Sequence, residues 1–417
     1  MLCLTSSALK AQYFNVGVSA IQDENIFDIY IPTTDRIHQV QLNFSDDWYA
    51  DPVNFDLSYT GELFFYRDLS SRNYHVHFLN FNTMYQIYGD DEEPEDPDDS
   101  EEGDDSSGAR MKAPQFVPPK HVDSLDQYVN LKMFAIGQFD GDAYEAYDNS
   151  HFGGVLSFRQ PVSQTMSIKP SYLFAYNRYR NLSGFTNFEN VLSLSLSAPG
   201  VFGGSFSAGI NFGKKNYTTP ASYTYVVSSN GNSGHGKGGA GGGPKERTVT
   251  VDLTTPSVSQ STLSAEFHRP LTPTTVGSLM LTYYGTPSTI ARALPNTLGG
   301  AGAQSDIFDD HYSYTGPVFA FRLSQLLPAE INVGFQGLIQ LKTYTFPAMD
   351  LLDSVVVADY RTDHRQEYVI SVSKRFGTGA GTSIKPTIEY HYFNNDSNAE
   401  YYVFTKNVYM LGLEFDF

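Results

Sequence analysis

Long segments in which apolar and polar residues alternate one by one constrain this chain more than any other feature of its 417 residues. Alternation with a period of two places apolar side chains on one face of an extended strand and polar side chains on the other. The pattern is clearest at the end of the chain, where one strand face carries Tyr409, Leu411, Leu413, Phe415 and Phe417. It recurs along the whole chain, and helical spacing is rare. We therefore expect an all-β protein.

The length of these segments and of their connections narrows the fold further. Many segments reach about ten residues or more, against about five to six in an average strand, and many begin or end with Tyr or Phe. Connections alternate between short, as at 161–165, and long, as at 285–310. No stretch has the roughly 18 nearly uncharged apolar residues that a membrane-spanning helix requires. These features predict a transmembrane antiparallel up-and-down β-barrel with short periplasmic turns and long outer loops. A soluble β-sandwich is the alternative, because its strands also alternate.

The alternating segments predict about 16 strands, an even number as in single-chain bacterial barrels. The first segment and 127–139 are the least regular, so 14 strands is the alternative. An even count places both termini on the side of the short turns. The predicted strands are residues 13–22, 37–47, 53–66, 73–88, 127–139, 152–160, 166–179, 187–198, 203–217, 247–268, 275–285, 311–324, 330–345, 366–376, 382–394 and 400–417.

Composition excludes several other classes of protein. The single cysteine, Cys3, excludes a disulfide framework and every Cys-rich metal site, because both need a second sulfur. The net charge of −19 is largely local, since the tract 90–105 holds 12 acids in 16 residues and leaves 34 acids against 27 bases elsewhere. Such a tract is typical of a solvated linker, and it lacks the glycine and glutamate spacing of a calcium-binding loop.

The chain is expected to form one domain. Residues 12–417 are the predicted barrel, and residues 1–11 are interpreted as the remnant of a signal peptide. Within the barrel domain, residues 89–126 are a predicted acidic flexible linker on the periplasmic side. Residues 218–246 are a predicted Gly-rich outer loop, since 231–243 contains eight glycines.

The C-terminal alternation ending in Phe417 resembles the terminal strand of bacterial outer-membrane β-barrels. This resemblance implies an outer-membrane location and a role for Tyr409, Leu411, Leu413, Phe415 and Phe417 as the segment that the barrel-assembly machinery engages. An ordinary edge strand at the end of the chain is the alternative. The hairpin 23–44 is similar to the first hairpin of several porin-like families. A broader likeness to outer-membrane porins covers most of the chain in pattern rather than in residue identity.

Two hairpins repeat each other at a separation of 216 residues. Ser157, Arg159, Ser167, Ile168, Lys169 and Pro170 recur as Ser373, Arg375, Ser383, Ile384, Lys385 and Pro386. The alternation places Arg159, Lys169, Arg375 and Lys385 on the polar face, and a 16-strand count places the two hairpins on opposite walls. One hypothesis is a pair of basic patches that favours anionic solutes. The alternative is that strand–turn–strand units converge on similar rims or retain an old duplication. Lys342 and Glu389 are further lumen candidates.

A barrel of about 16 strands is too wide for side chains to fill, so an aqueous channel is the expected consequence. We therefore expect an outer-membrane channel for passive or weakly selective diffusion of small polar solutes. The alternative is a structural or adhesive barrel with a plugged lumen and partner-binding outer loops.

An enzyme is not expected, because nucleophile-elbow, paired-His helix and phosphate-binding loop motifs are all missing from the sequence. Asp309, Asp310 and His311 at a predicted rim have a simpler interpretation as solvated loop residues. His75 and His77 share a strand face but lack a third metal ligand nearby in sequence. No cofactor, metal or nucleic acid is expected. The expected partners are membrane lipid, the assembly machinery and small polar solutes, with a homo-oligomer left open.

Overall fold

The structure is a computed structural model of the chain. It describes residues 11–28, 31–50, 52–88, 127–141, 144–145, 148–218, 221–229, 245–253, 257–285, 311–344, 348–350, 355–358, 360–379 and 381–417. The predicted signal remnant up to residue 10 and the predicted linker 89–126 lie outside these residues. None of the helices among the described residues is long and apolar enough to cross a membrane.

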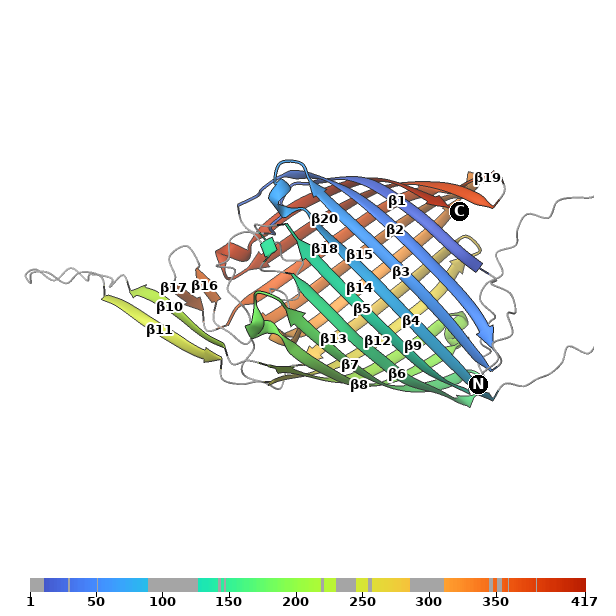
Figure 1. The fold of residues 1–417 in the computed structure, drawn as a ribbon, viewed down its shortest axis with the longest axis horizontal. Coiled ribbons are helices and arrows are strands. Elements are labelled where there is room, and N and C mark those ends of the chain that lie inside the picture. The colour runs from blue at the N-terminus through green and yellow to red at the C-terminus, as the bar shows by residue number, and fades with distance from the viewer. Residues whose placement is uncertain are drawn as a thin grey trace, which may run out of the picture.

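Sixteen antiparallel strands form the wall of a closed barrel (Figure 1). They are β1 (Ala11–Asp23), β2 (Asp35–Ala50), β3 (Val53–Tyr66), β4 (Tyr74–Tyr88), β5 (Gln127–Asp140), β6 (Asn149–Ser163), β7 (Met166–Tyr179), β8 (Asn187–Pro199), β9 (Ser205–Tyr217), β12 (Ser257–Thr272), β13 (Thr275–Gly285), β14 (Tyr314–Leu327), β15 (Ile331–Tyr344), β18 (Thr362–Lys374) with its continuation β19 (Phe376–Gly379), β20 (Thr382–Ser397) and β21 (Phe404–Asp416).

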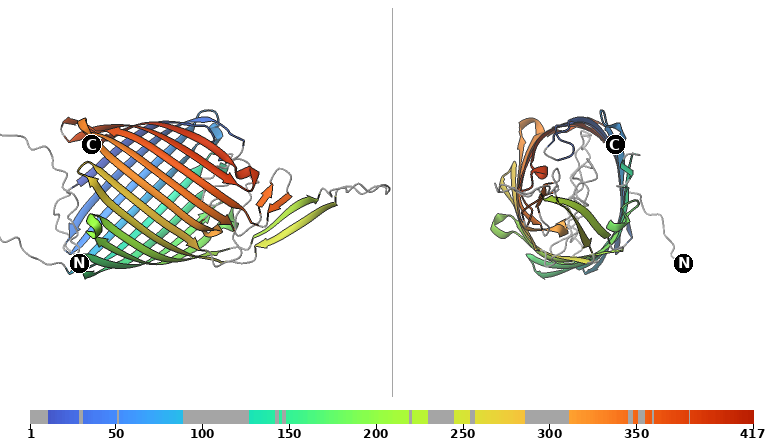
Figure 2. Two further views of the ribbon diagram at one scale, coloured as in Figure 1. Left: turned by 180° about the vertical axis from the view of Figure 1, so that it is seen from behind. Right: turned by 90° about the vertical axis from the view of Figure 1, so that its left-hand side faces the viewer.

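Each wall strand pairs with its neighbours along the chain, and β1 pairs with β21 to close the ring. The closing register runs from Asn15 opposite Asp416 to Asp23 opposite Val408. Seen end on, the strands form an oval ring (Figure 2). Closure satisfies the backbone donors and acceptors that an open sheet would leave unpaired at its edges. The prediction of an antiparallel up-and-down β-barrel of about 16 strands is therefore confirmed.

The two ends of the barrel differ in their connections. Strand β1 begins and strand β21 ends at the end with the short turns, here called the terminal end (Figures 1 and 2). At the other end, here called the loop end, two small hairpins extend beyond the wall, β10 (Ala221–Ser229) with β11 (Lys245–Leu253) and β16 (Ala348–Asp350) with β17 (Val355–Ala358). This arrangement agrees with the predicted alternation of short and long connections.

One predicted strand was misplaced. The alternating segment 247–268 is divided in the structure between β11 of the loop-end hairpin and wall strand β12. Strand β10 likewise falls inside the predicted Gly-rich loop 218–246, of which residues 219–220 and 230–244 lie outside the described part. A hairpin strand in a loop alternates like a wall strand, because both are extended, so the pattern does not separate them.

The outward face of the wall is apolar and accessible. Ile388 is 61% exposed and its cross-strand neighbour Leu411 is 59% exposed, and the exposed outward set continues round the barrel with residues such as Leu192, Phe212, Leu279 and Phe319. Soluble monomers rarely expose continuous apolar patches above a few hundred Å². A soluble β-sandwich, whose apolar faces would pack together, is therefore wrong for this chain.

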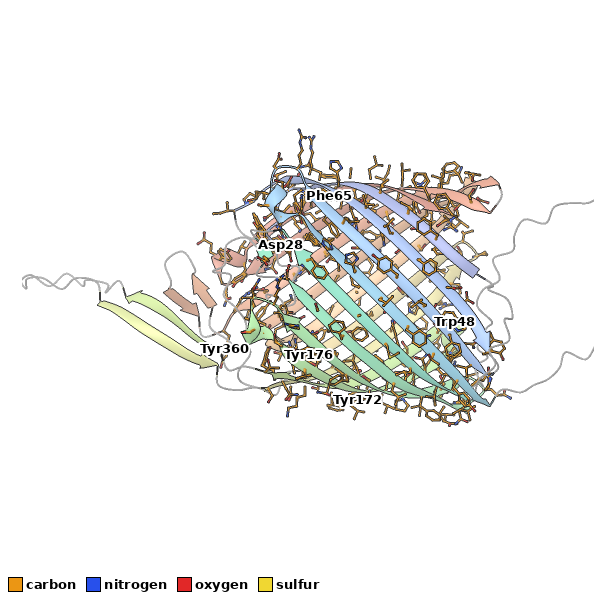
Figure 3. The ribbon with its side chains drawn as sticks, in the orientation of Figure 1. Asp28, Trp48, Phe65, Tyr172, Tyr176 and Tyr360 are labelled. Carbon is orange, nitrogen blue, oxygen red and sulfur yellow. The ribbon has the colours of Figure 1, made fainter. Side chains whose placement is uncertain are left out.

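Aromatic side chains gather toward both ends of the apolar face. Toward the terminal end, the rings of Trp48 and Phe55 stack with centroids 5.6 Å apart. Toward the loop end, the rings of Tyr176 and Phe188 lie 4.7 Å apart. Figure 3 labels Trp48 near one end and Tyr176 toward the other. Aromatic rings at two levels of a barrel are typical of the two interfaces of a membrane.

Burial is concentrated at the loop end rather than in the middle of the molecule. Tyr312 and Val258, 2% and 1% exposed, form a small core with Tyr217. Tyr312 belongs to the 3₁₀ turn η5 (His311–Ser313) that precedes β14. Its hydroxyl donates to Glu189 Oε1 at 2.8 Å, and the ring covers Gly213, where an added Cβ would collide with it. The wall is therefore held by its backbone ladder and by packed rims, as expected of a wide barrel.

Candidate functional site

A chain of side-chain hydrogen bonds crosses the closure of the barrel on its inner face. Thr60 of β3 donates to Asn43 Oδ1 at 2.9 Å, and Asn43 Nδ2 donates to Asn15 Oδ1 at 2.9 Å. Asn15 Nδ2 donates in turn to Glu414 Oε1 at 2.9 Å. The other oxygen of Glu414 accepts from Lys385 Nζ at 2.8 Å. The chain ties together β3, β2, β1, β21 and β20 and holds Glu414 and Lys385 in one orientation.

Asp416 completes this network at the terminal end. Its Oδ1 accepts from the Tyr13 hydroxyl at 2.6 Å and from Asn15 Nδ2 at 2.8 Å. Its Oδ2 accepts from Ser383 and lies 3.4 Å from Arg375 Nη2. Arg375 stands at the break between β18 and β19. Asp416 therefore links the first strand, the last strand and the β18–β20 hairpin of the barrel.

The same wall is hollowed into a niche of about 370 Å³. This volume falls at the lower end of the roughly 300–1,000 Å³ usual for small-molecule sites. The inward side chains that line it come from six neighbouring strands and are Gln39, Gln41, Ser19, Asn332, Ser371, Ser373, Lys385, Thr387, Glu389, Met410 and Glu414, together with Gly17 and Gly412. The lining is thus rich in amides, hydroxyls and charges, with no aromatic ring.

The predicted lumen cations Lys385 and Arg375 do lie on this wall, but both are close to carboxylates. Lys385 is bonded to Glu414, with about one third of each side chain exposed. Arg375 lies beside Asp416. Sequence reasoning identified the cations and missed both acids, because the partners lie 29 and 41 residues further along the chain. A paired cation attracts anions less strongly than a free one, so the two pairs weaken the expected basic character of this wall.

Arg159 and Lys169 lie on the opposite wall. Their strands β6 and β7 are the sixth and seventh of the ring, whereas β18 and β20 are the fourteenth and fifteenth. The guanidinium carbon of Arg159 lies 5.8 Å from the ring centroid of Tyr128. Among the described residues neither cation has an ion pair within 4.0 Å. The two repeated hairpins therefore present different charge environments to the lumen.

The remaining predicted lumen residues, Lys342 and Glu389, have contrasting positions. Lys342 is 3% exposed at the loop end, with Nζ 4.8 Å from the centroid of Tyr314, and it faces Asp363 across the ladder. It belongs to the packed rim rather than to the open inner wall. Glu389 lines the niche, and its Oε2 lies 3.0 Å from His391 Nε2.

The loop-end rim holds further buried charges that the sequence analysis did not single out. Lys406 is 5% exposed and lies 2.5 Å from Asp28 and 3.5 Å from Asp23. Arg361 forms two hydrogen bonds with Asp363, from Nε to Oδ1 and from Nη2 to Oδ2. Figure 3 labels Asp28 at this end. The Lys406 pairs join β21 to the end of β1 and the segment after it, whereas the Arg361–Asp363 pair is local to the start of β18.

The predicted assembly residues of β21 lie on the outward face. Leu411 and Leu413 are exposed, and Phe415 is half-buried in the wall. The backbone N–H of Phe417 donates to Phe14 O at 3.0 Å, and the two rings lie 6.0 Å apart. In the folded barrel this strand is paired on both sides. Its role in assembly remains a prediction.

The histidine pair considered for metal binding is also on the outward face. Nδ1 of His75 lies 2.9 Å from Nε2 of His77, whose Nδ1 lies 2.8 Å from the Tyr59 hydroxyl. In the described part of the chain, no group of three or more His, Cys, Asp or Glu side chains could hold a metal ion. Asp309 and Asp310 lie outside that part.

Comparison with known proteins gives matches only among solved structures. No family model and no curated protein matches the chain. OprD from Pseudomonas aeruginosa is 9% identical with a TM-score of 0.41, over 99% of this chain and 97% of that one. OccAB1 from Acinetobacter baumannii is 10% identical with a TM-score of 0.44, over 97% and 96%, and OccAB2 from the same organism is 7% identical with a TM-score of 0.42, over 99% of each chain. At these scores the likeness does not establish a shared function, so the closed barrel and its inner wall remain the basis for inference.

Proposed function

We propose that this chain is an outer-membrane channel through which small polar solutes diffuse passively or with weak selectivity. One observation carries the proposal: a closed ring of 16 strands that is apolar outside and polar inside. Barrels of about 8 strands are filled by their own side chains, whereas those of 16 to 18 strands leave an aqueous channel. The terminal end then faces the periplasm and the loop end faces the outside of the cell, as in other barrels with short periplasmic turns.

The unequal charge pairing of the two walls supports a modest preference for anions. Arg159 and Lys169 face the lumen without a close carboxylate among the described residues, while Lys385 and Arg375 are met by Glu414 and Asp416. The selective element of the channel would therefore be the β6–β7 wall alone, rather than two equivalent basic patches. The acidic tract would lie on the periplasmic side and act as a solvated linker.

The permeability test uses purified protein in phospholipid vesicles. Small uncharged polar solutes should enter at rates that fall with solute size, and vesicles without protein should stay closed. Folded, inserted protein that leaves the vesicles impermeable would contradict the proposal.

The selectivity test compares two double variants. R159Q/K169Q removes two inward cations and should lower the anion-to-cation permeability ratio at low salt. R178Q/K214Q removes two cations from exposed positions of β7 and β9 on the outward face and should leave the ratio unchanged. The difference should shrink at 1 M salt, where the Debye length is about 3 Å. Equal effects of the two variants would argue against the β6–β7 wall.

A plugged, non-conducting barrel is the second candidate, and a specific observation favours considering it. The turn η5 inserts Tyr312 over Gly213 on the inner wall at the loop end, so at least one loop-end element folds inward. Removal of the Tyr312 ring by Tyr312→Ala distinguishes a plugged barrel from an open channel. A plug held by this ring predicts that conductance appears only in the variant, whereas an open channel predicts conductance in both proteins.

A further inference from the structure

The niche on the β18–β20–β21–β1 wall has a regular construction that the general channel function does not require. Its floor is a row of residues that face one another across successive strands. In register order these are Asn332, Ser373, Thr387, Gly412, Ser19 and Gln39. Most are small, and Gly412 has no side chain. The row therefore forms a trough that runs across the strands, here called the seam trough.

Larger side chains border the seam trough on both sides. Toward the terminal end lie Lys385 and Glu414, and toward the loop end lie Glu389 and Met410. Lys385 and Glu389 are four residues apart on one strand, which places their Cα atoms about 13 Å apart. The trough is thus wide enough for a small solute, and the cavity that it forms has a volume of about 370 Å³.

The charged groups at the border are already engaged by other side chains of the protein. Lys385 Nζ is 2.8 Å from Glu414 Oε2, and His391 Nε2 is 3.0 Å from Glu389 Oε2. The other oxygen of Glu414, Oε1, accepts a hydrogen bond from Asn15 Nδ2. An ionic solute would have to compete with these contacts, so the site favours a solute without net charge.

The floor offers hydrogen-bond donors and acceptors in nearly equal measure. The Ser19 hydroxyl donates to Gln39 Oε1 at 3.0 Å, and among the described residues no acceptor engages the two Gln39 amide N–H groups, which a solute could therefore use. Ser373 and Thr387 present hydroxyls, which both donate and accept. A hydroxyl-rich solute has the same dual character, whereas an apolar solute would leave these groups unpaired.

We propose that the seam trough is a binding site for small uncharged polyhydroxylated solutes. The proposal rests on the proposed channel function in that the trough would lie along the solute path. Binding is weak, as suits a channel that must also release its solute. The hydrogen-bond chain through Asn15 and Asn43 acts by holding Glu414 and Lys385 in place.

The test uses three probes with the same six-carbon chain: sorbitol, gluconate and glucamine, which are neutral, anionic and cationic. Saturation-transfer NMR on the full chain in detergent micelles measures binding without requiring conduction. Sorbitol should show the strongest transfer. Equal signals from all three probes, or a stronger signal from either charged probe, would overturn the proposal.

Two matched variants locate the binding. G412L should lower sorbitol affinity at least about tenfold by filling the trough. Its backbone should tolerate the change, because an added Cβ would meet nothing closer than 3.9 Å. S193L adds the same side chain to the inner face of β8, eight strands away, and should change affinity less than about twofold. Equal loss in both variants, or no loss in G412L, would refute the assignment.

A second pair of variants tests the charge balance. E414Q leaves Lys385 without its carboxylate and should shift the preference from sorbitol toward gluconate. K385Q/E414Q removes both charges of this ion pair and should restore the preference for sorbitol. An unchanged preference in E414Q would contradict the argument. Conductance measured on the same preparations separates the two hypotheses. A barrel that conducts but does not bind sorbitol would refute only the binding site in the seam trough, and a barrel that binds sorbitol but does not conduct would refute only the channel function.

Discussion

Two adjacent residues on β21 allow a direct test of which face of the wall meets lipid. Leu411 points outward and is 59% exposed, while Met410 points inward and lines the niche. Both lie near the middle of Phe404–Asp416. Replacement of each by arginine places the same charge at nearly the same depth on opposite faces.

The expected costs differ clearly. An arginine on the lipid face near the bilayer midplane lowers the free energy of unfolding by about 2–4 kcal/mol. On the inner face the guanidinium of Met410→Arg can reach water and the Glu389 carboxylate, so we expect a loss of about 0–1 kcal/mol. A difference of about 2 kcal/mol changes the folding equilibrium constant about 30-fold.

Equilibrium unfolding in guanidinium chloride with phospholipid vesicles measures both variants. The only tryptophan, Trp48, lies on the outward face with its ring stacked on Phe55, so its fluorescence reports whether the wall is inserted. A conservative variant, Leu411→Val, controls for lost packing. If Met410→Arg costs as much as Leu411→Arg, or more, the assignment of faces is refuted.

Three further perturbations have defined outcomes. Arg361→Met leaves the buried Asp363 carboxylate without its main partner and should lower the free energy of unfolding by about 3 kcal/mol. The double variant that also carries Asp363→Leu should recover part of this stability. A larger loss of stability in the double variant would contradict the stabilising role of the ion pair. Gly337→Val introduces a Cβ where the Phe321 ring covers the backbone and should destabilise the wall by about 1–3 kcal/mol in the same unfolding titration. An unchanged free energy of unfolding would show that this ring moves freely. Deletion of Phe417 removes a backbone hydrogen bond to the first strand and should slow membrane insertion in assembly assays. Unchanged insertion kinetics would contradict the predicted role of Phe417 in assembly.

Much of the fold was predictable from the sequence because the membrane imposes a strict rule on each strand. Lipid outside and water inside force alternation over about ten residues, and this pattern located even the irregular strands β1 and β5. The boundary at residues 254–256 was missed. Hydrophobic alternation continues from β11 toward β12, and only the Pro256 position marks a break.

The details of the inner wall were not predictable in the same way. Lys385 and Glu389 were placed inward by alternation, but their environment depends on strands that are distant in sequence. Asn15 reaches Glu414 across the barrel closure, a separation of 399 residues. Only the register of β1 against β21 brings them together. Charge compensation in a lumen is therefore a property of closure, and a single sequence does not reveal it.

The proposed channel function requires a continuous path of water through this barrel. Single-channel recording of the purified, folded protein in a planar lipid bilayer tests it most directly. An open lumen predicts stepwise, ohmic current increments whose size grows in proportion to salt concentration. A bilayer that stays electrically silent, although the same preparation is shown to be folded and inserted, would contradict the claim.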